Sequence, residues 1–471
     1  MMKSLYSTIV FILLSNVLFA QEPIGTWYGT LNIQGTQLGL VFHVNKNGNE
    51  YNTTMDSPQQ GAKGMPASKT SYVNKTLIVE SSTIGMKYTG TYVPDSNKIN
   101  GTFEQGGFRT ALVLSTTPGK ELAAKIQPRP QDPKEFPYKQ EEVTFSNSVN
   151  GNTLAGTLTT PTDGKTNKIV ILITGSGPQN RNAELVQYNH RPFLVLSDYL
   201  TRQGIAVLRY DDRGVGKSTG VFAQATTGDL ADDVDAAVNY ISSRADLKNM
   251  MIGLTGHSEG GMIAPMVASR NPKVKYIVLM GGPGIPIYQL YAQQIADAMK
   301  LAGAPADEVA KKMATNLKIF TAMKDAKDSP LEQAALEVEL ALRKELDLMP
   351  LEKLDRAGKE TIVQQTLNNY KRPWFRYFIG FDPSLYLTKV KCPVLALNGT
   401  LDFQVESTAN LAGIKTGLEK AGNKRFEIVP MEGLNHLFQK GTTGAETEYG
   451  NIEETINAAA LEKISTWIKG I

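Results

Sequence analysis

The sequence predicts an α/β protein in which a doubly wound, mostly parallel sheet follows a separate antiparallel β domain and is interrupted by a helical insertion. Continuous apolar runs at residues 168–174 and 204–210 are typical of parallel strands buried on both faces. Amphipathic helices are expected between such runs, and the one after Thr227 places on a single face Leu230, Val234, Ala237, Val238 and Ile241. Further strands are expected at residues 251–255, 274–280, 394–397 and 425–429.

Composition and charge exclude several kinds of partner. The 471 residues are 41% hydrophobic and 20% charged, which is ordinary for a globular protein. Lys and Arg number 49 against 46 Asp and Glu, so the formal charge of +3 is too small to indicate nucleic acid or an anionic membrane. We therefore expect a small-molecule substrate as the partner, and homo-oligomerisation is compatible with the sequence.

Residues 1–20 have the order of a secretory signal peptide. Lys3 precedes an apolar run at residues 8–14, and the segment closes with small and apolar residues up to Ala20. We expect cleavage after Ala20 and no membrane anchor. Because Cys392 is the single cysteine, no intramolecular disulfide can form, and its apolar neighbours favour a packing role. Export without disulfides indicates a periplasmic or secreted protein.

Residues 21–116 are expected to form a small antiparallel β barrel or sandwich, because short alternating runs are separated by turn residues at hairpin spacing. Trp27 suits a packing role better than a ligand site. Residues 117–140 contain Pro128, Pro130, Pro133 and Pro137 and are expected to form an extended linker. The second domain, residues 141–471, would then open with a hairpin that turns at residues 150–151.

A helical cap is expected at about residues 285–383, between two strands of the sheet. Helical sequence covers residues 288–301, 306–322 and 331–348. Such an insertion would cover the strand ends where α/β sheets bind their ligands. The cap ends in the aromatic-rich stretch 373–378, whose members Trp374, Phe375 and Tyr377 either pack the cap on the core or line a substrate pocket.

The stretch Gly256-His257-Ser258-Glu259-Gly260 carries the strongest chemical signal. An apolar strand precedes it and a helix follows, as in the G-x-S-x-G nucleophile elbow, where glycines relieve the crowding of a strained turn around an exposed serine. The alternative is a glycine-rich turn without chemistry.

A serine nucleophile needs a base and an acid that orients the base. Of the four histidines, His43 and His190 lie upstream and His257 adjoins the serine. His436, in the loop after the last expected strand, is the candidate base. Asp402, after the strand at residues 394–397, is the candidate acid, although loop carboxylates often cap structure.

Two backbone N–H groups should stabilise the oxyanion of the tetrahedral intermediate. We expect one from Glu259, directly after the nucleophile, and the other from Ser176, with Gly177 as the alternative. Residues 214–219 only partly match a phosphate-binding loop, since the first glycine would fall at Asp211. Nucleotide binding is therefore not expected.

Several motifs together resemble bacterial α/β-hydrolase fold esterases with a β-rich domain before the hydrolase core. They lie at residues 174–178, 210–218, 256–261, 391–394 and 402–405. The chain order Ser258, Asp402, His436 is also that of α/β-hydrolases. The resemblance implies carboxylesterase activity on short acyl chains without cofactor or metal, and a structural role for residues 211–218. Relatives by fold include serine aminopeptidases and acyl-CoA thioesterases.

The sequence therefore predicts an exported serine hydrolase that cleaves carboxylic esters through an acyl-enzyme. A peptidase releasing amino-terminal residues is one alternative, in which acidic groups would bind the α-ammonium. A glycan- or lipid-binding protein with a vestigial triad is the other. Aminoacyl amides tested against simple esters, and labelling by a fluorophosphonate, would separate the three.

Overall fold

The computed structural model describes residues 22–471 apart from 34–35, 49, 59–61, 83, 106–107, 119–127, 163–165 and 349–355. The expected signal peptide, residues 1–20, lies outside the described residues. The chain divides into two compact units, one reaching Ala123 and the other covering Ala124–Ile471, with the short stretch Pro58–Gly61 left out of the first. Each unit is described by itself.

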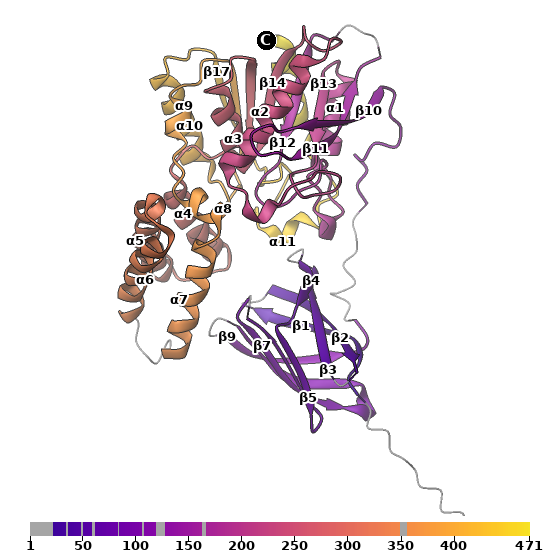
Figure 1. The fold of residues 1–471 in the computed structure, drawn as a ribbon, viewed down its shortest axis with the longest axis vertical. Coiled ribbons are helices and arrows are strands. Elements are labelled where there is room, and N and C mark those ends of the chain that lie inside the picture. Colours follow the sequence, from indigo (N-terminus) through magenta and orange to yellow (C-terminus); the bar gives the residue numbers. More distant parts are fainter. Residues whose placement is uncertain are drawn as a thin grey trace, which may run out of the picture. The chain divides into compact units, whose positions relative to one another are not determined.

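The first unit is one antiparallel sheet of nine strands in the order β4-β3-β2-β1-β9-β8-β7-β6-β5. The strands are β1 Gly25–Ile33, β2 Thr36–Asn47, β3 Glu50–Ser57, β4 Ala62–Pro66, β5 Lys69–Val73, β6 Thr76–Ser81, β7 Met86–Val93, β8 Lys98–Gln105 and β9 Phe108–Ser115. The expected antiparallel β domain is thus present as a single curved sheet (Figure 1).

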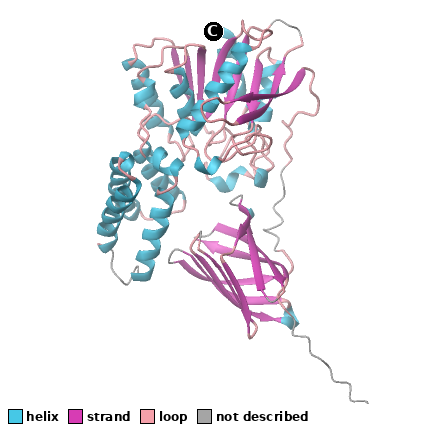
Figure 2. Cartoon of the chain, viewed as in Figure 1, coloured by secondary structure: helices cyan, strands magenta, loops and turns pink. Residues whose placement is uncertain are grey.

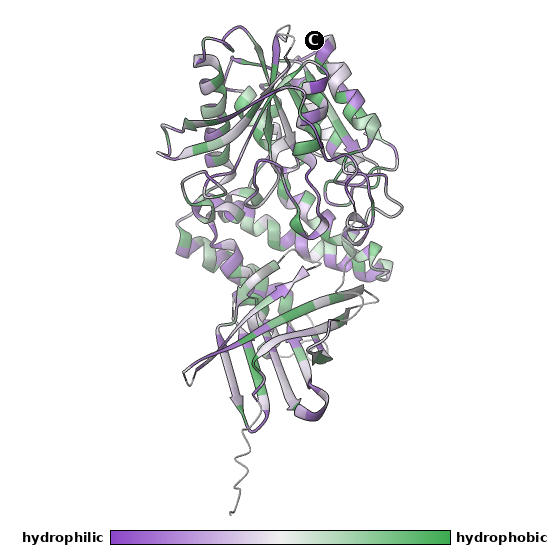
Figure 3. Cartoon of the chain, turned by 90° about the vertical axis from the view of Figure 1, so that its right-hand side faces the viewer, coloured by the Kyte–Doolittle hydropathy of each residue, from purple (hydrophilic) through white to green (hydrophobic). Residues whose placement is uncertain are grey.

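Alternating side chains give this unit its core. Buried and more exposed residues alternate along β7, and green hydrophobic segments alternate with paler and purple ones along the strands in Figure 3. Trp27 is 2% exposed, donates its indole N–H to the Pro23 carbonyl at 2.8 Å and packs edge-on against Tyr92. It is therefore a core residue.

The second unit contains an eight-stranded sheet in the order β10-β11-β13-β12-β14-β15-β16-β17. The strands are β10 Lys139–Ser146, β11 Thr153–Thr160, β12 Lys168–Ile173, β13 Ala206–Tyr210, β14 Met251–His257, β15 Val274–Met280, β16 Val394–Gly399 and β17 Phe426–Met431. β11 is antiparallel to both neighbours, and the strands from β13 to β17 are parallel. Numbered within the unit, the order is 1-2-4-3-5-6-7-8, that of the α/β-hydrolase fold.

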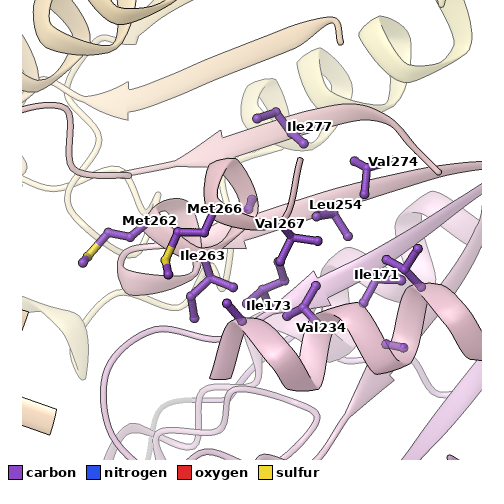
Figure 4. Packing of buried hydrophobic residues seen from close by; sticks show 14 of the residues in the cluster. Ile171, Ile173, Val234, Leu254, Met262, Ile263, Met266, Val267, Val274 and Ile277 are labelled. Atoms are coloured by element: carbon purple, nitrogen blue, oxygen red, sulfur yellow. The ribbon is translucent and has the colours of Figure 1, made fainter. Parts of the chain in front are cut away.

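Helices cover both faces of this sheet (Figure 2). They are α1 Pro192–Arg202, α2 Thr227–Ser243, α3 Glu259–Ala268, α9 Ser384–Leu387, α10 Ser407–Lys420, α11 Glu446–Tyr449 and α12 Ala458–Gly470. Along β12, Ile169, Ile171 and Ile173 join the core under α2, α3 and α10, whereas Val170 and Leu172 join the core under α1 and α12. Figure 4 shows Ile171 and Ile173 beside Val234 of α2 and Val267 of α3. A strand buried on both faces explains the continuous apolar run.

The cap lies between β15 and β16, as expected, and has its own apolar core. Its helices are α4 Ile287–Leu301, α5 Ala306–Asp325, α6 Leu331–Asp347, α7 Arg356–Tyr370 and α8 Pro373–Ile379. Figure 1 shows α5, α6 and α7 grouped beside one another away from the sheet. α7 was not expected from the sequence, where its apolar residues are few. Among the described residues, no helix combines the length and apolar character needed to cross a membrane.

The carboxyl-terminal part of the expected linker packs on the second unit. Arg129 is 6% exposed and donates to backbone carbonyls of Tyr188 and Tyr449, and Gln131 donates to the Ile456 carbonyl at 2.7 Å. The second unit thus begins before residue 141, where the proline pattern placed its start. Prolines keep the segment extended, but its buried side chains fix it in place.

Candidate active site

Ser258 occupies a strained turn between β14 and α3. Its φ of 54° and ψ of −117° lie outside the regions that side-chain-bearing residues favour. The neighbouring glycines are required by close packing, because a Cβ at Gly256 would lie 1.9 Å from the Gly260 carbonyl oxygen. A Cβ at Gly260 would lie 2.3 Å from the Ile173 carbonyl oxygen. The elbow geometry that the motif predicts is therefore present.

His436 and Asp402 form a buried pair beside the elbow. His436 Nδ1 lies 2.7 Å from Asp402 Oδ2, and their side chains are 5% and 0% exposed. The other oxygen, Oδ1, accepts the N–H groups of Gln404 and Val405, each at 2.9 Å. Since an ionised carboxylate only accepts, the proton lies on Nδ1 and leaves Nε2 as the basic nitrogen.

The end of β15 connects this pair to Ser258. The Ser258 N–H donates to the Met280 carbonyl at 2.9 Å. The next residue, Gly281, has a φ of +58°, and a Cβ there would lie 3.3 Å from Asp402 Oδ2 and 3.5 Å from the His436 ring. One tight turn thus holds the serine and the histidine–carboxylate pair close to each other.

His257 holds the loop that carries the base. Its Nε2 lies 2.8 Å from the His436 carbonyl oxygen, and the two rings are 4.7 Å apart. Burial lowers the pKa of His257 to about 3, so the ring is neutral at physiological pH and Nε2–H donates to the carbonyl. The sequence indicated only that His257 should point away from the chemistry, and it gave no sign of this contact.

The candidate oxyanion loop, residues 174–179, passes close to the nucleophile. A Cβ at Gly175 would lie 3.2 Å from the Ser258 Cβ. Asp212 supports the loop by accepting the Thr174 hydroxyl at 2.9 Å and the Gln179 N–H at 2.9 Å. Burial raises the pKa of Asp212 to about 7. The loop after β13, expected to be structural, therefore supports the loop that contains Ser176.

The Glu259 side chain connects four parts of the unit. It is 1% exposed and accepts the Thr227 hydroxyl of α2 at 2.6 Å and the Trp374 indole N–H of the cap at 2.9 Å. The Ser176 side chain also hydrogen-bonds to it, and burial raises the pKa of Glu259. The sequence indicated the backbone N–H of Glu259 for the oxyanion and acidic groups as partners of an α-ammonium in a peptidase, so this role of the Glu259 carboxylate was missed.

A pocket of about 370 Å³ contains Ser258, His436, Ser176 and Glu259 in its lining. Trp374, a candidate lining residue, also lines it. Phe375 does not and packs edge-on against Tyr291 in the cap. Tyr377 lines a separate pocket together with Thr226 and Tyr386. Of the three aromatic candidates, only Trp374 therefore lies at the nucleophile.

Metal and cysteine chemistry are not indicated by the described side chains. Where residues are described, no group of three or more His, Cys, Asp and Glu is placed to hold a metal ion. Cys392 is largely buried beside β16, and burial raises its pKa to about 11, so it is a poor nucleophile.

Comparison with known proteins gives one family-level match. Residues 191–346, which include Ser258 but neither Asp402 nor His436, match the model of the family described as serine aminopeptidase, S33. The comparison with curated proteins finds no match.

Solved structures resemble the chain at low identity. An esterase of Pyrococcus furiosus is 16% identical and covers 72% of this chain and 93% of its own, with a TM-score of 0.43. A dienelactone hydrolase of Anabaena variabilis is 16% identical over 71% of this chain and 98% of its own, with a TM-score of 0.39. Est1E of Butyrivibrio proteoclasticus, solved with ferulic acid, is 19% identical over 70% and 96%, with a TM-score of 0.39.

Because these TM-scores are low, the fold is assigned from the strand order, the elbow and the inserted cap. These features agree with the family match over residues 191–346. The second unit therefore has the α/β-hydrolase fold, and the β-rich unit precedes it in the sequence.

Proposed function

We propose that the protein is an exported serine hydrolase that cleaves carboxylic esters with short acyl chains. The observation that carries this proposal is the strained Ser258 elbow in one pocket with His436, which is paired with Asp402. The signal-peptide pattern of residues 1–20 supports export, and the pocket of about 370 Å³ suits a small substrate.

In the proposed reaction, His436 Nε2 removes the Ser258 proton as the hydroxyl oxygen attacks the ester carbonyl. Asp402 holds Nδ1–H and stabilises the imidazolium. Backbone N–H groups of Glu259 and Ser176 would stabilise the oxyanion, and His436 returns the proton to the departing alcohol. Water, deprotonated by His436, then hydrolyses the acyl-enzyme.

The test is a panel of p-nitrophenyl acyl esters and aminoacyl p-nitroanilides, followed in the first turnover. We expect a burst of p-nitrophenol equal to the enzyme concentration, followed by slower turnover that declines as the acyl chain lengthens. Anilide hydrolysis without comparable ester hydrolysis would contradict the esterase proposal.

An aminopeptidase is the second candidate. The family match favours it, and Glu446, at the start of α11, lines the pocket and could bind an α-ammonium group. Glu446→Gln should then abolish activity on aminoacyl anilides and leave simple esters unaffected.

A further inference from the structure

The pocket at Ser258 has two chemically different linings. One comes from α3 and the cap and is mainly apolar, with Met262, Leu290, Tyr291, Trp374 and Phe378, although Gln294 of α4 also belongs to it. Trp374 and Phe378 stack with ring centroids 4.8 Å apart. The other comes from loops and α11 of the core and is mainly polar, although Leu185, Val405 and Leu437 also belong to it. We call its polar members the polar wall: Gln187, Tyr188, Gln404, Glu446 and Tyr449.

Members of the polar wall contact one another. Gln404 Nε2 donates to the Tyr449 hydroxyl at 3.1 Å, and the rings of Tyr188 and Tyr449 meet edge-on at 6.2 Å. Burial raises the pKa of both tyrosines, and the negative charge of Glu446 adds a smaller contribution in the same direction. The wall thus brings amide, hydroxyl and carboxylate groups together in the lining of one pocket.

The wall is held in place from behind by Arg129. This guanidinium is 6% exposed and donates to the Tyr188 carbonyl at 2.7 Å, the Tyr449 carbonyl at 3.3 Å and the Glu454 carbonyl at 3.3 Å. A buried guanidinium is costly unless its N–H groups are satisfied, and here they bind the backbone of both wall tyrosines. The polar groups therefore face the pocket from a preorganised backbone.

An ester places its acyl and alcohol parts on different sides of the carbonyl that Ser258 attacks. A short acyl chain matches the apolar lining at the cap. The polar wall offers donors and acceptors together, which suits hydroxyl groups, because each hydroxyl both donates and accepts. The carbon chain of a simple alkyl alcohol would make no hydrogen bonds with these groups.

We propose that the natural substrate is a short-chain ester of a polyhydroxylated, sugar-like alcohol, whose hydroxyl groups bind the polar wall. This inference rests on the proposed ester hydrolysis. It adds the chemical class of the alcohol and assigns the wall residues as determinants of specificity.

The test compares two acetates of equal shape, 6-O-acetylglucose and cyclohexylmethyl acetate. Both present a primary alcohol attached to a six-membered ring, and only the sugar carries further hydroxyl groups. With two or more hydrogen bonds to the wall, kcat/KM should be at least about tenfold higher for the sugar ester. Equal values would overturn the proposal while leaving the esterase function intact, whereas hydrolysis of neither acetate nor any p-nitrophenyl ester would contradict that function itself.

Substitutions in the polar wall test which residues distinguish the sugar ester from cyclohexylmethyl acetate. Gln187→Leu and Gln404→Leu should each lower kcat/KM about three- to tenfold more for the sugar ester than for cyclohexylmethyl acetate. The matched control is Gln364→Leu, an exposed glutamine of α7 outside the pocket, which should change neither value. Parallel losses on both acetates would show that the variants only disturb the pocket.

The Glu446→Gln variant distinguishes a wall that binds hydroxyl groups from a wall that binds an ammonium group. Glu446→Gln keeps hydrogen-bonding groups but removes the charge, so sugar-ester hydrolysis should fall less than about tenfold. The polyol assignment would be overturned by two results together: the wild type prefers substrates with a free α-amino group, and Glu446→Gln loses more than about tenfold in kcat/KM on those substrates alone. The wall would then bind a cation.

Discussion

Replacing Glu259 tests whether its carboxylate joins the elbow, the oxyanion loop, α2 and the cap. Glu259→Ala leaves the Thr227 hydroxyl and the Trp374 indole N–H without their acceptor. Each buried donor without a partner costs about 1 to 3 kcal/mol, and the indole is only partly buried. We therefore expect the free energy of unfolding to fall by about 2 to 4 kcal/mol.

The assay is urea unfolding of the wild type and Glu259→Ala, paired with kcat/KM on p-nitrophenyl acetate. Because the Ser176 side chain also binds this carboxylate, kcat/KM should drop about tenfold or more in the folded variant. Glu332→Ala, an exposed glutamate of α6, is the control and should change stability by less than about 0.5 kcal/mol. A Glu259→Ala protein with wild-type stability and activity would show that the Glu259 carboxylate does not join these segments.

Three further changes have defined outcomes. Gly256→Ala should prevent elbow formation, because its Cβ would lie 1.9 Å from a backbone oxygen, and purified protein should show no fluorophosphonate labelling. Arg129→Met should lower the free energy of unfolding by about 3 kcal/mol or more through unpaired carbonyls, measured in urea, whereas exposed Arg109→Met should not. Asp212 has a folded-state pKa of about 7, above its ordinary 3.8, so between about pH 4 and pH 7 the unfolded state loses its proton first. The stability of the wild type relative to Asp212→Asn should therefore decline as pH rises through this window and level off above it, and urea unfolding at several pH values that showed a constant difference would contradict the shift.

Elements with a clear hydrophobic period and residues with distinctive chemistry could be predicted from the sequence. Buried runs identified the parallel strands β12 to β17 to within a few residues, since parallel strands need continuous apolar sequence. Ser258, Asp402 and His436 could be chosen as candidates because few residue types can perform nucleophilic catalysis and their order along the chain is informative. The structure brings Asp402 and His436 within 2.7 Å of each other.

Contacts between distant segments could not be predicted. Arg129 lies in a proline-rich stretch that looks solvent-exposed, and its acceptors Tyr188 and Tyr449 follow 59 and 320 residues later. The Glu259 carboxylate is buried where α2 and the cap, which lie far apart in the sequence, both contact it.

Helical geometry explains why only one of the three aromatic candidates in residues 373–378 lines the pocket. On α8, Trp374 and Phe378 are four residues apart, so they share the face that lines the pocket, while Phe375 and Ile379 share the face toward the cap core. Tyr377 falls on a third face. Treating the stretch as a cluster, without its helical period, grouped side chains that point in different directions.

A fluorophosphonate probe with peptide mass mapping, alongside ester hydrolysis by Ser258→Ala, tests whether Ser258 is the nucleophile that the His436–Asp402 pair activates. We expect one covalent adduct on Ser258 in the wild type, none in the variant, and loss of ester turnover in the variant. Ester turnover that persists in folded Ser258→Ala, or an adduct on another residue, would contradict it.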